Sequence, residues 1–525
     1  MPSHLLLALT GLLFANVQAT QHIGGLAPGS LLGIYASLLL AAACLGPSAW
    51  RLASRNSTLT EVGHANCADT VWRKVFLSAA LLYWLALAAA TAVSPLPAPI
   101  AEQALTMGLL PTGYLLVRAG LRAGIDWPRI WSVFRLTAIA LAVMALGERL
   151  LTDARAYALL SDPNVLAGLF NVFILTQFAT LAVRLRQGET VRADIALLAL
   201  FSAAQCVTGS LSFLLCRLAA LLPLALFSVR ALPARRTGSL LGITAGAVLL
   251  AVACSGGTVE TPTTKLQGIS QHSSFTVRLE MARSSLAIYR DSPWYGSGLG
   301  SYKLYYPRYR STFDTGTTGD LAHNDYVQFL QEGGPLLLTS LLALGLLVVA
   351  RTAQAIYQGW RKGPTAALLA QAGAGCALLA LLLHAGMNFI FYVAPLAFLF
   401  GVLLARLAPA PEKPTETTAV SGGQLAVFAS VLVALTIGLL ATLGARALFL
   451  ALTRETCELQ ACQVLRSNVP FVKKLTAYLA GTQPTWVPTR DYLIANYLKT
   501  ERTVAGTTEK TQWRVRAFHE VSTLV

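Results

Sequence analysis

The side chains best suited to acid–base chemistry stand together in one hydrophilic stretch, residues 275–337. His323, Asn324 and Asp325 lie near the end of this stretch, and Arg278 lies near its start. A histidine can accept a proton near neutral pH, and an arginine can bind a phosphate through two parallel hydrogen bonds. This combination indicates base chemistry beside a bound phosphate.

A glycine-rich turn and a group of tyrosines lie between these residues. In the turn D-S-P-W-Y-G-S-G-L-G, Gly296, Gly298 and Gly300 could leave backbone amides accessible to an anion. Tyrosine faces and hydroxyls suit sugar rings, but tyrosines beside a membrane also anchor the chain at the lipid surface, so both interpretations stay open. The tyrosines are Tyr289, Tyr295, Tyr302, Tyr305, Tyr306 and Tyr309.

The sequence carries no motif for a nucleotide or a metal. It contains no G-x-x-x-x-G-K-[ST] loop, no G-x-S-x-G and no H-E-x-x-H, and the hydrophilic stretch has no D-x-D pair. We therefore expect no cofactor and no metal. ATP-driven transport and metal-dependent hydrolysis lose support for the same reason.

Membrane helices are the elements that must position these residues. Hydrophobic residues make up 55% of the 525 residues, and charged residues make up 12%, about half the usual share. Apolar runs near the length that crosses a bilayer recur along the chain. The sequence predicts an all-α polytopic membrane protein with about 12–13 transmembrane helices. The runs are 4–19, 31–50, 75–95, 102–118, 130–148, 164–183, 194–209, 211–228, 238–254, 335–350, 365–384, 387–405 and 425–450.

Basic residues are spread unevenly over the connections between these runs. With a cytoplasmic N-terminus, the even-numbered connections are cytoplasmic and carry most arginines and lysines, as the positive-inside rule requires. Arg149 and Arg155 are the exceptions in the short outer connections. This distribution explains the net charge of +16 better than nucleic-acid binding does.

The same pattern predicts the domain organisation. Residues 1–255 hold transmembrane helices 1–9, residues 256–334 form a large outer loop, residues 335–450 hold helices 10–13, and residues 451–525 form a helical outer tail. Cys457 and Cys462 stand in that tail with the spacing C-x4-C. They form either a disulfide or two thiols on a helix.

The hydrophilic stretch resembles the signature region of the O-antigen ligase and polymerase superfamily. Arg278 matches its arginine-bearing segment. The turn "P-x-x-G-x-G-x-G" matches Pro293, Gly296, Gly298 and Gly300. The element "H-N-[DE]-[YF]-x-Q-x-x-x-E-x-G" matches His323, Asn324, Asp325, Tyr326, Gln328, Glu332 and Gly334. Leu337 stands where the ligase form has a small residue or tyrosine, which favours the polymerase form slightly.

Three flanking elements are also similar to the family, and the resemblance spans roughly 160–405. Asp162-Pro163-Asn164 resembles a "D/N-P-N" helix start. Thr208-Gly209-Ser210 resembles a turn that usually continues into an arginine, but Leu211 follows here and the nearest arginine is Arg217. His384 to Asn388 resembles "H-S-x-x-D-F", with Asn388 in place of the acid.

The resemblance implies a metal-independent, inverting glycosyltransferase of the bacterial inner membrane, with its active-site loop and tail in the periplasm. Such an enzyme moves a glycan from undecaprenyl diphosphate to an acceptor hydroxyl. It implies His323, Asn324 and Asp325 as catalytic residues, with His323 as the base or its positioner. It implies a diphosphate or glycan site formed by Arg278, Arg217, Gly298, Gly300, Tyr326, His384 and Asn388.

The partners implied are the lipid-linked glycan donor, a lipid A–core or glycan acceptor, and membrane lipid, with no nucleic acid. Apart from the slight preference for a polymerase at Leu337, the sequence does not separate a ligase, a polymerase and a protein O-oligosaccharyltransferase. A solute transporter is the competing class, but the chain shows no inverted repeat and no matched intramembrane charges. The sugars, the acceptor and the oligomeric state stay open.

Overall fold

A computed structural model describes residues 67–94, 99–122, 126–151, 155–158, 160, 162–254, 273–311 and 319–409. These residues form helices and their connections and contain no β-strand, which confirms the predicted all-α class. The predicted runs at 4–19, 31–50 and 425–450 lie outside the described residues. So do most of the loop before Ser273 and the whole tail with Cys457 and Cys462.

Ten helices coincide with predicted apolar runs. They are α3 (Cys67–Ala92), α4 (Pro99–Arg122), α5 (Trp127–Leu151), α6 (Pro163–Arg186), α7 (Arg192–Val207), α8 (Leu211–Ala231), α9 (Ala234–Cys254), α13 (Asp325–Lys362), α14 (Ala366–Ala385) and α15 (Ala394–Leu407). Two more helices, α11 (Ser273–Arg290) and α12 (Tyr302–Tyr309), come from the hydrophilic stretch.

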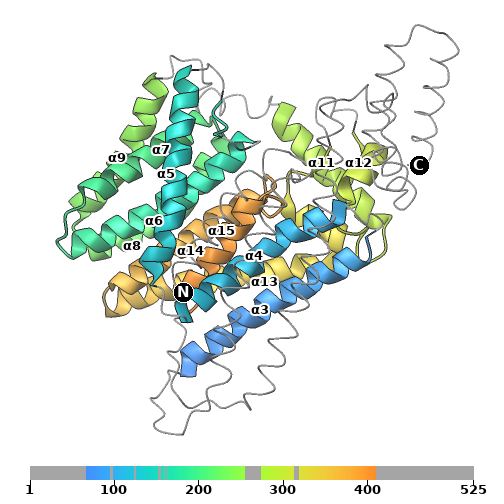
Figure 1. Ribbon diagram of the computed structural model, residues 1–525, viewed down its shortest axis with the longest axis horizontal. Coiled ribbons are helices and arrows are strands. Elements are labelled where there is room, and N and C mark those ends of the chain that lie inside the picture. The colour runs from blue at the N-terminus through green and yellow to red at the C-terminus, as the bar shows by residue number, and fades with distance from the viewer. Residues whose placement is uncertain are drawn as a thin grey trace, which may run out of the picture.

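Six helices in the described part are long and apolar enough to cross a membrane, namely α3, α5, α6, α8, α13 and α14. This confirms a polytopic membrane protein, whereas its orientation across the bilayer stays a prediction. Helix α6 is apolar all round and is buried along nearly its whole length, as expected for the centre of a bundle. It packs against α7, α8 and α14, while α13 packs between α3 and α14 (Figure 1).

Helix α13 begins at Asp325, before the point where the apolar run starts. The sequence places the end of the outer loop at residue 334, because polarity alone marks the residues before it as loop. In the structure, these residues form the first turns of α13 and bury Asp325, Gln328 and Glu332. A kink at Gly334, with φ 63° and ψ −166°, joins them to the apolar part of the helix.

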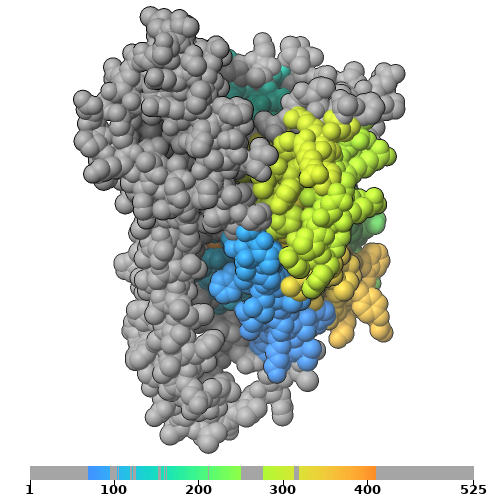
Figure 2. Space-filling model, turned by 90° about the vertical axis from the view of Figure 1, so that its right-hand side faces the viewer, coloured from blue at the N-terminus to red at the C-terminus, as the bar shows by residue number. Residues whose placement is uncertain are grey.

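The glycine-rich turn between α11 and α12 packs on this kink. Gly296 and Gly334 both have positive φ, and a Cβ on Gly296 would lie 2.6 Å from the Gly334 nitrogen. The turn also binds the end of α3, since Leu299 N donates to Ala90 O at 3.1 Å and Ser94 Oγ donates to Leu299 O at 2.7 Å. Figure 2 shows the α11–α12 segment in yellow-green lying against α3 in blue. The turn is therefore a fixed part of the bundle.

Gly334→Ala should destabilise this contact. The new Cβ would lie 2.7 Å from the Trp294 carbonyl oxygen, and the backbone conformation is one that L-residues avoid. We expect a loss of more than about 2 kcal/mol of unfolding free energy. Thermal unfolding in detergent measures it, with Gly147→Ala as the control, because no atom lies within 4 Å of a Cβ there. Equal melting temperatures for both variants would contradict this account of the kink.

Candidate functional site

His323 and Asn388 form the centre of the candidate site. His323 Nδ1 lies 3.0 Å from Asn388 Oδ1, and the imidazole packs edge-on against the Phe389 ring at 4.8 Å. The His323 side chain is half-buried, and Asn388 is fully buried. His323 has a φ of 53°, a conformation rare for residues other than glycine, and such strain concentrates at functional sites.

The first residues of α13 hold this pair in place. Asn324 caps the helix, accepting a hydrogen bond from Val327 N at 3.2 Å, and its Nδ2 donates to Gly386 O at 3.0 Å. Asp325 is fully buried and accepts hydrogen bonds from Ile390 N at 2.7 Å and Phe391 N at 3.0 Å. Both residues therefore fix the α14–α15 connection that carries Asn388. Asp325 positions this connection through its Oδ2 atom, while its Oδ1 atom is buried and has no hydrogen-bond partner among the described residues.

Glu332 holds the glycine-rich turn in a similar way. Its buried carboxylate accepts hydrogen bonds from the amides of Gly300 and Tyr302 and from the Tyr392 hydroxyl at 2.9 Å. The Gly298 amide donates to the Glu332 carbonyl at 2.9 Å. The expectation that Gly298 and Gly300 present amides to an anion therefore needs correction. Both amides serve inside the protein, because the Gly298 amide satisfies a backbone carbonyl and the Gly300 amide acts on the buried carboxylate.

His384 lies deeper than His323 and is fully buried. Its ring packs on Phe213 with centroids 3.4 Å apart, and neither ring nitrogen has a hydrogen-bond partner among the described residues. Arg278 and His323 both lie within electrostatic range of it. The structure thus brings together His323, His384, Asn388 and Arg278, which are far apart in sequence.

Arg278 reaches this cluster from α11. Burial lowers the pKa of its guanidinium, the Asp162 carboxylate opposes that effect, and the positive charge of Arg155 adds to it. Arginine nevertheless stays protonated in proteins, so Arg278 brings a positive charge to the site. Asp162 itself caps α6, accepting a hydrogen bond from Asn164 N at 2.6 Å.

Arg155 is a site residue that the sequence did not single out. Its Nε donates to Thr208 O at 2.7 Å, and its Nη2 donates to Asn164 Oδ1 at 3.2 Å. Ser210 Oγ donates to the same Asn164 oxygen at 2.7 Å. Arg155 therefore joins the helix start at Asn164 to the turn at Thr208. The sequence carried one signal for Arg155, namely a basic residue in a short outer connection where the positive-inside rule predicts few.

Arg217 occupies a separate network among α6, α7 and α8. Its guanidinium donates to the Gln205 side chain, and Gln205 donates to Asn171. Asn171 Nδ2 in turn donates to Phe213 O at 2.9 Å. Within the described part of the chain, Phe213 is the residue that connects this network to His384. The structure thus does not place Arg217 beside Arg278.

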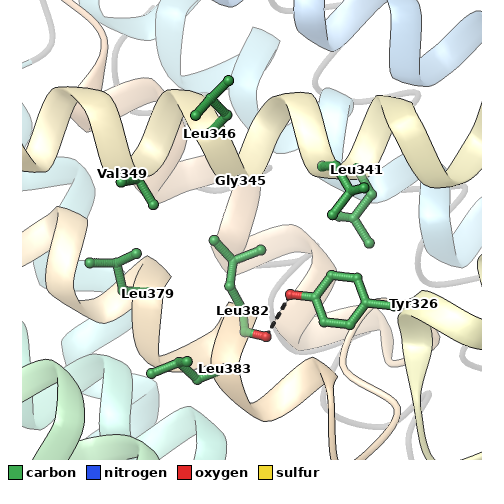
Figure 3. A pocket seen from close by; sticks show the side chains of 9 residues that line it. Tyr326, Leu341, Gly345, Leu346, Val349, Leu379, Leu382 and Leu383 are labelled. Carbon is green, nitrogen blue, oxygen red and sulfur yellow. Dashed lines mark hydrogen bonds between the residues drawn. The ribbon is translucent and has the colours of Figure 1, made fainter.

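An apolar groove of about 450 Å³ adjoins the site between α13 and α14 (Figure 3). Tyr326 stands at one end of it and donates its hydroxyl to Leu382 O at 2.7 Å. The remaining lining is aliphatic and consists of Leu341, Leu342, Gly345, Leu346, Val349, Leu379, Leu382 and Leu383. In the described residues, no group of three or more histidine, cysteine, aspartate or glutamate side chains could hold a metal.

Comparison with known protein families finds a match to one part of the chain. Residues 196–342 match the model of a protein family described as O-antigen ligase. This match supports the resemblance of that part of the chain to the O-antigen ligase and polymerase superfamily. The match includes the glycine-rich turn, Arg278 and His323. Asn388 and Arg155 lie outside it. No curated protein matches the chain.

The geometry gives each residue of the superfamily signature a distinct task. His323 faces Asn388, Asn324 caps α13, and Asp325 and Glu332 bind the two neighbouring connections. Gln328 accepts a hydrogen bond from Ala322 N at 2.8 Å, next to His323. The signature therefore consists largely of residues that position one histidine at the mouth of the helix bundle.

Asp325→Ala should destabilise the protein. The substitution leaves the buried amides of Ile390 and Phe391 without their acceptor, and each such loss costs about 1–3 kcal/mol. Asp291→Ala is the matched control, because that exposed carboxylate bonds only the Tyr309 hydroxyl among the described residues. Thermal unfolding in detergent should separate the two variants by several degrees. A melting temperature for Asp325→Ala no lower than that of the control would overturn the positioning role.

Proposed function

We propose that the protein is a metal-independent, inverting glycosyltransferase of the bacterial inner membrane. It moves a glycan from undecaprenyl diphosphate to an acceptor sugar hydroxyl during surface polysaccharide assembly. The contact of His323 with Asn388, beside the positive charge of Arg278, carries this proposal. The O-antigen ligase domain supports the general class of reaction.

His323 acts as the general base. When its Nδ1–H donates to Asn388 Oδ1, the Nε2 atom carries the lone pair and can accept a proton. The acceptor hydroxyl gives its proton to Nε2 while its oxygen bonds to the anomeric carbon. The bond from that carbon to the diphosphate breaks on the opposite face, and the diphosphate leaves with the electron pair. The anomeric configuration therefore inverts.

Arg278 stabilises the leaving group. Negative charge grows on the diphosphate as the glycosidic bond breaks, and a guanidinium placed there in advance lowers the barrier. Its partial burial strengthens this effect, because charges interact more strongly where water is excluded. Diphosphate is already a good leaving group, so these residues suffice without a metal.

The apolar groove suits the lipid part of the donor. Its aliphatic lining runs along α13 and α14, two helices able to cross a membrane, and Tyr326 at its end lies three residues from His323. An isoprenoid chain in this groove would place its diphosphate head near the polar cluster. The donor is therefore lipid-linked, and its reacting end lies on the periplasmic side.

Replacing His323 by Asn tests the base directly. Asparagine tolerates positive φ better than alanine does, so His323→Asn should fold normally while lacking the proton acceptor. We expect at least about a hundred-fold loss of transfer, as for a general base. The measurement is complementation of a host lacking the chain, with surface glycan resolved on a ladder gel and expression checked.

The gel also distinguishes the acceptors. Single capped units left on lipid A–core identify a polymerase, whereas accumulated lipid-linked polymer identifies a ligase. Loss of glycan from proteins alone identifies a protein O-oligosaccharyltransferase. A wild-type ladder in the His323→Asn strain would show that His323 is structural, and a solute transporter would then be favoured.

Filling the groove tests the lipid-linked donor. A Cβ at Gly345 would make ordinary contact with Leu382 at 3.7 Å, so Gly345→Ala should be harmless. Gly345→Phe fills the groove, and we expect it to raise KM for a long-chain donor about ten-fold with a small change in kcat. A donor with a short prenyl chain should be affected less. Equal effects on both donors would place the lipid elsewhere.

A further inference from the structure

The aromatic residues of the hydrophilic stretch fall into two groups in the structure. Tyr302 and Tyr306 are fully buried, and their rings stack with centroids 4.9 Å apart. Together with Met281 and Ile288, they form a small core between α11 and α12. These two tyrosines therefore hold the helices of the stretch together, and they are too deeply buried to contact a sugar or a lipid.

Trp294 and Tyr295, in the glycine-rich turn, form the second group. Their side chains are 74% and 43% exposed, and the two rings meet edge to face with centroids 5.9 Å apart. The backbone beneath them is held, since the Tyr289 hydroxyl donates to the Trp294 carbonyl at 3.2 Å. Leaving two large aromatic rings in water forfeits the free energy that their burial would give. This pair therefore indicates a surface that meets a partner.

The turn is attached to two membrane helices at the points where their apolar parts end. Leu299 N donates to Ala90 O at 3.1 Å, close to the end of α3. A Cβ placed on Gly334 would lie 2.7 Å from the Trp294 carbonyl oxygen, directly before the apolar run 335–350 of α13. Both helices are long and apolar enough to cross a bilayer. The turn therefore lies at the level where the hydrocarbon of the bilayer meets the headgroups.

The surroundings of the two rings favour a lipid over a sugar. Val93 follows α3 and Leu336 follows the kink of α13, and both are exposed apolar residues beside the two attachment points. The Asp291 carboxylate, close along the chain, accepts a hydrogen bond from the Tyr309 hydroxyl at 2.6 Å. A sugar site needs polar side chains that converge on the ligand's hydroxyls. Tryptophan and tyrosine among apolar residues instead suit the headgroup level of a membrane.

We infer that Trp294 and Tyr295 insert into the headgroup region of the bilayer and anchor the glycine-rich turn at a fixed depth. The partner is the bulk phospholipid of the membrane, so this contact is distinct from any contact with a glycan donor and goes beyond the proposed function. Helix α11 leads directly into the turn. The anchor therefore also sets the depth at which α11 and its Arg278 lie relative to the lipid headgroups.

Depth-dependent quenching of tryptophan fluorescence tests the anchor. The full-length protein is placed in bilayers that carry either a nitroxide on the lipid headgroup or bromine near the chain ends, and subtracting the emission of Trp294→Phe isolates the Trp294 signal. Trp84→Phe is the control, because Trp84 is an exposed residue of α3 that lies about 9 Å deeper along the helix than Ala90. We expect the nitroxide to quench Trp294 at least about two-fold more than bromine does, and the reverse order for Trp84.

Three results would overturn the inference. Stronger quenching of Trp294 by bromine would place its ring in the hydrocarbon, and quenching by dissolved acrylamide alone would place it in water. Protection from acrylamide by a soluble glycan would identify a sugar-binding surface instead. Tyr295→Trp supplies a second reporter at the adjacent position, which should follow the same order of quenching as Trp294. The measurement involves no glycan transfer, so a failure here leaves the proposed function standing.

Discussion

Two buried carboxylates at the start of α13 hold the candidate site together. Asp325 binds the amides of Ile390 and Phe391, and Glu332 binds the amides of Gly300 and Tyr302. A carboxylate removed from water needs such donors, and a backbone amide removed from water needs such an acceptor. The buried carboxylates and the buried amides therefore fix one another's positions. The α14–α15 connection and the glycine-rich turn take up one position because these bonds cannot be replaced by solvent.

This constraint also explains how His323 keeps a strained backbone. A residue other than glycine with positive φ needs surroundings that determine its conformation on both sides. Asn324 follows it as the cap of α13, and Gln328 binds the Ala322 amide that precedes it. The imidazole is thus held by its neighbours in the chain as well as by Asn388. The strain is compatible with a base that must stay aimed at one point.

The sequence predicted the helices of the bundle well and the partners within it poorly. Apolar runs report which residues avoid water, so α3 to α9 and α13 to α15 match the predicted runs. The apolar-run criterion placed the start of α13 too late, because the first turns of this helix are polar in sequence yet buried in the structure. The glycine-rich motif also predicted that the amides of Gly298 and Gly300 could bind an anion, whereas in the structure both amides interact with Glu332. Arg155 escaped notice because its partners lie on other helices, a relation that spacing along the chain does not contain.

Asn388 shows how the structure changes the meaning of a residue. In the sequence, it stands where an acid is usual and suggests a lost function. In the structure, its Oδ1 faces His323 Nδ1 and can still set the tautomer and direction of the imidazole. An aspartate would do this with a negative charge, and under the proposed function that charge would lie close to the departing diphosphate, where like charges repel strongly in a site with little water. The amide orients the base without opposing the anion, so the cationic character supplied by Arg278 is preserved.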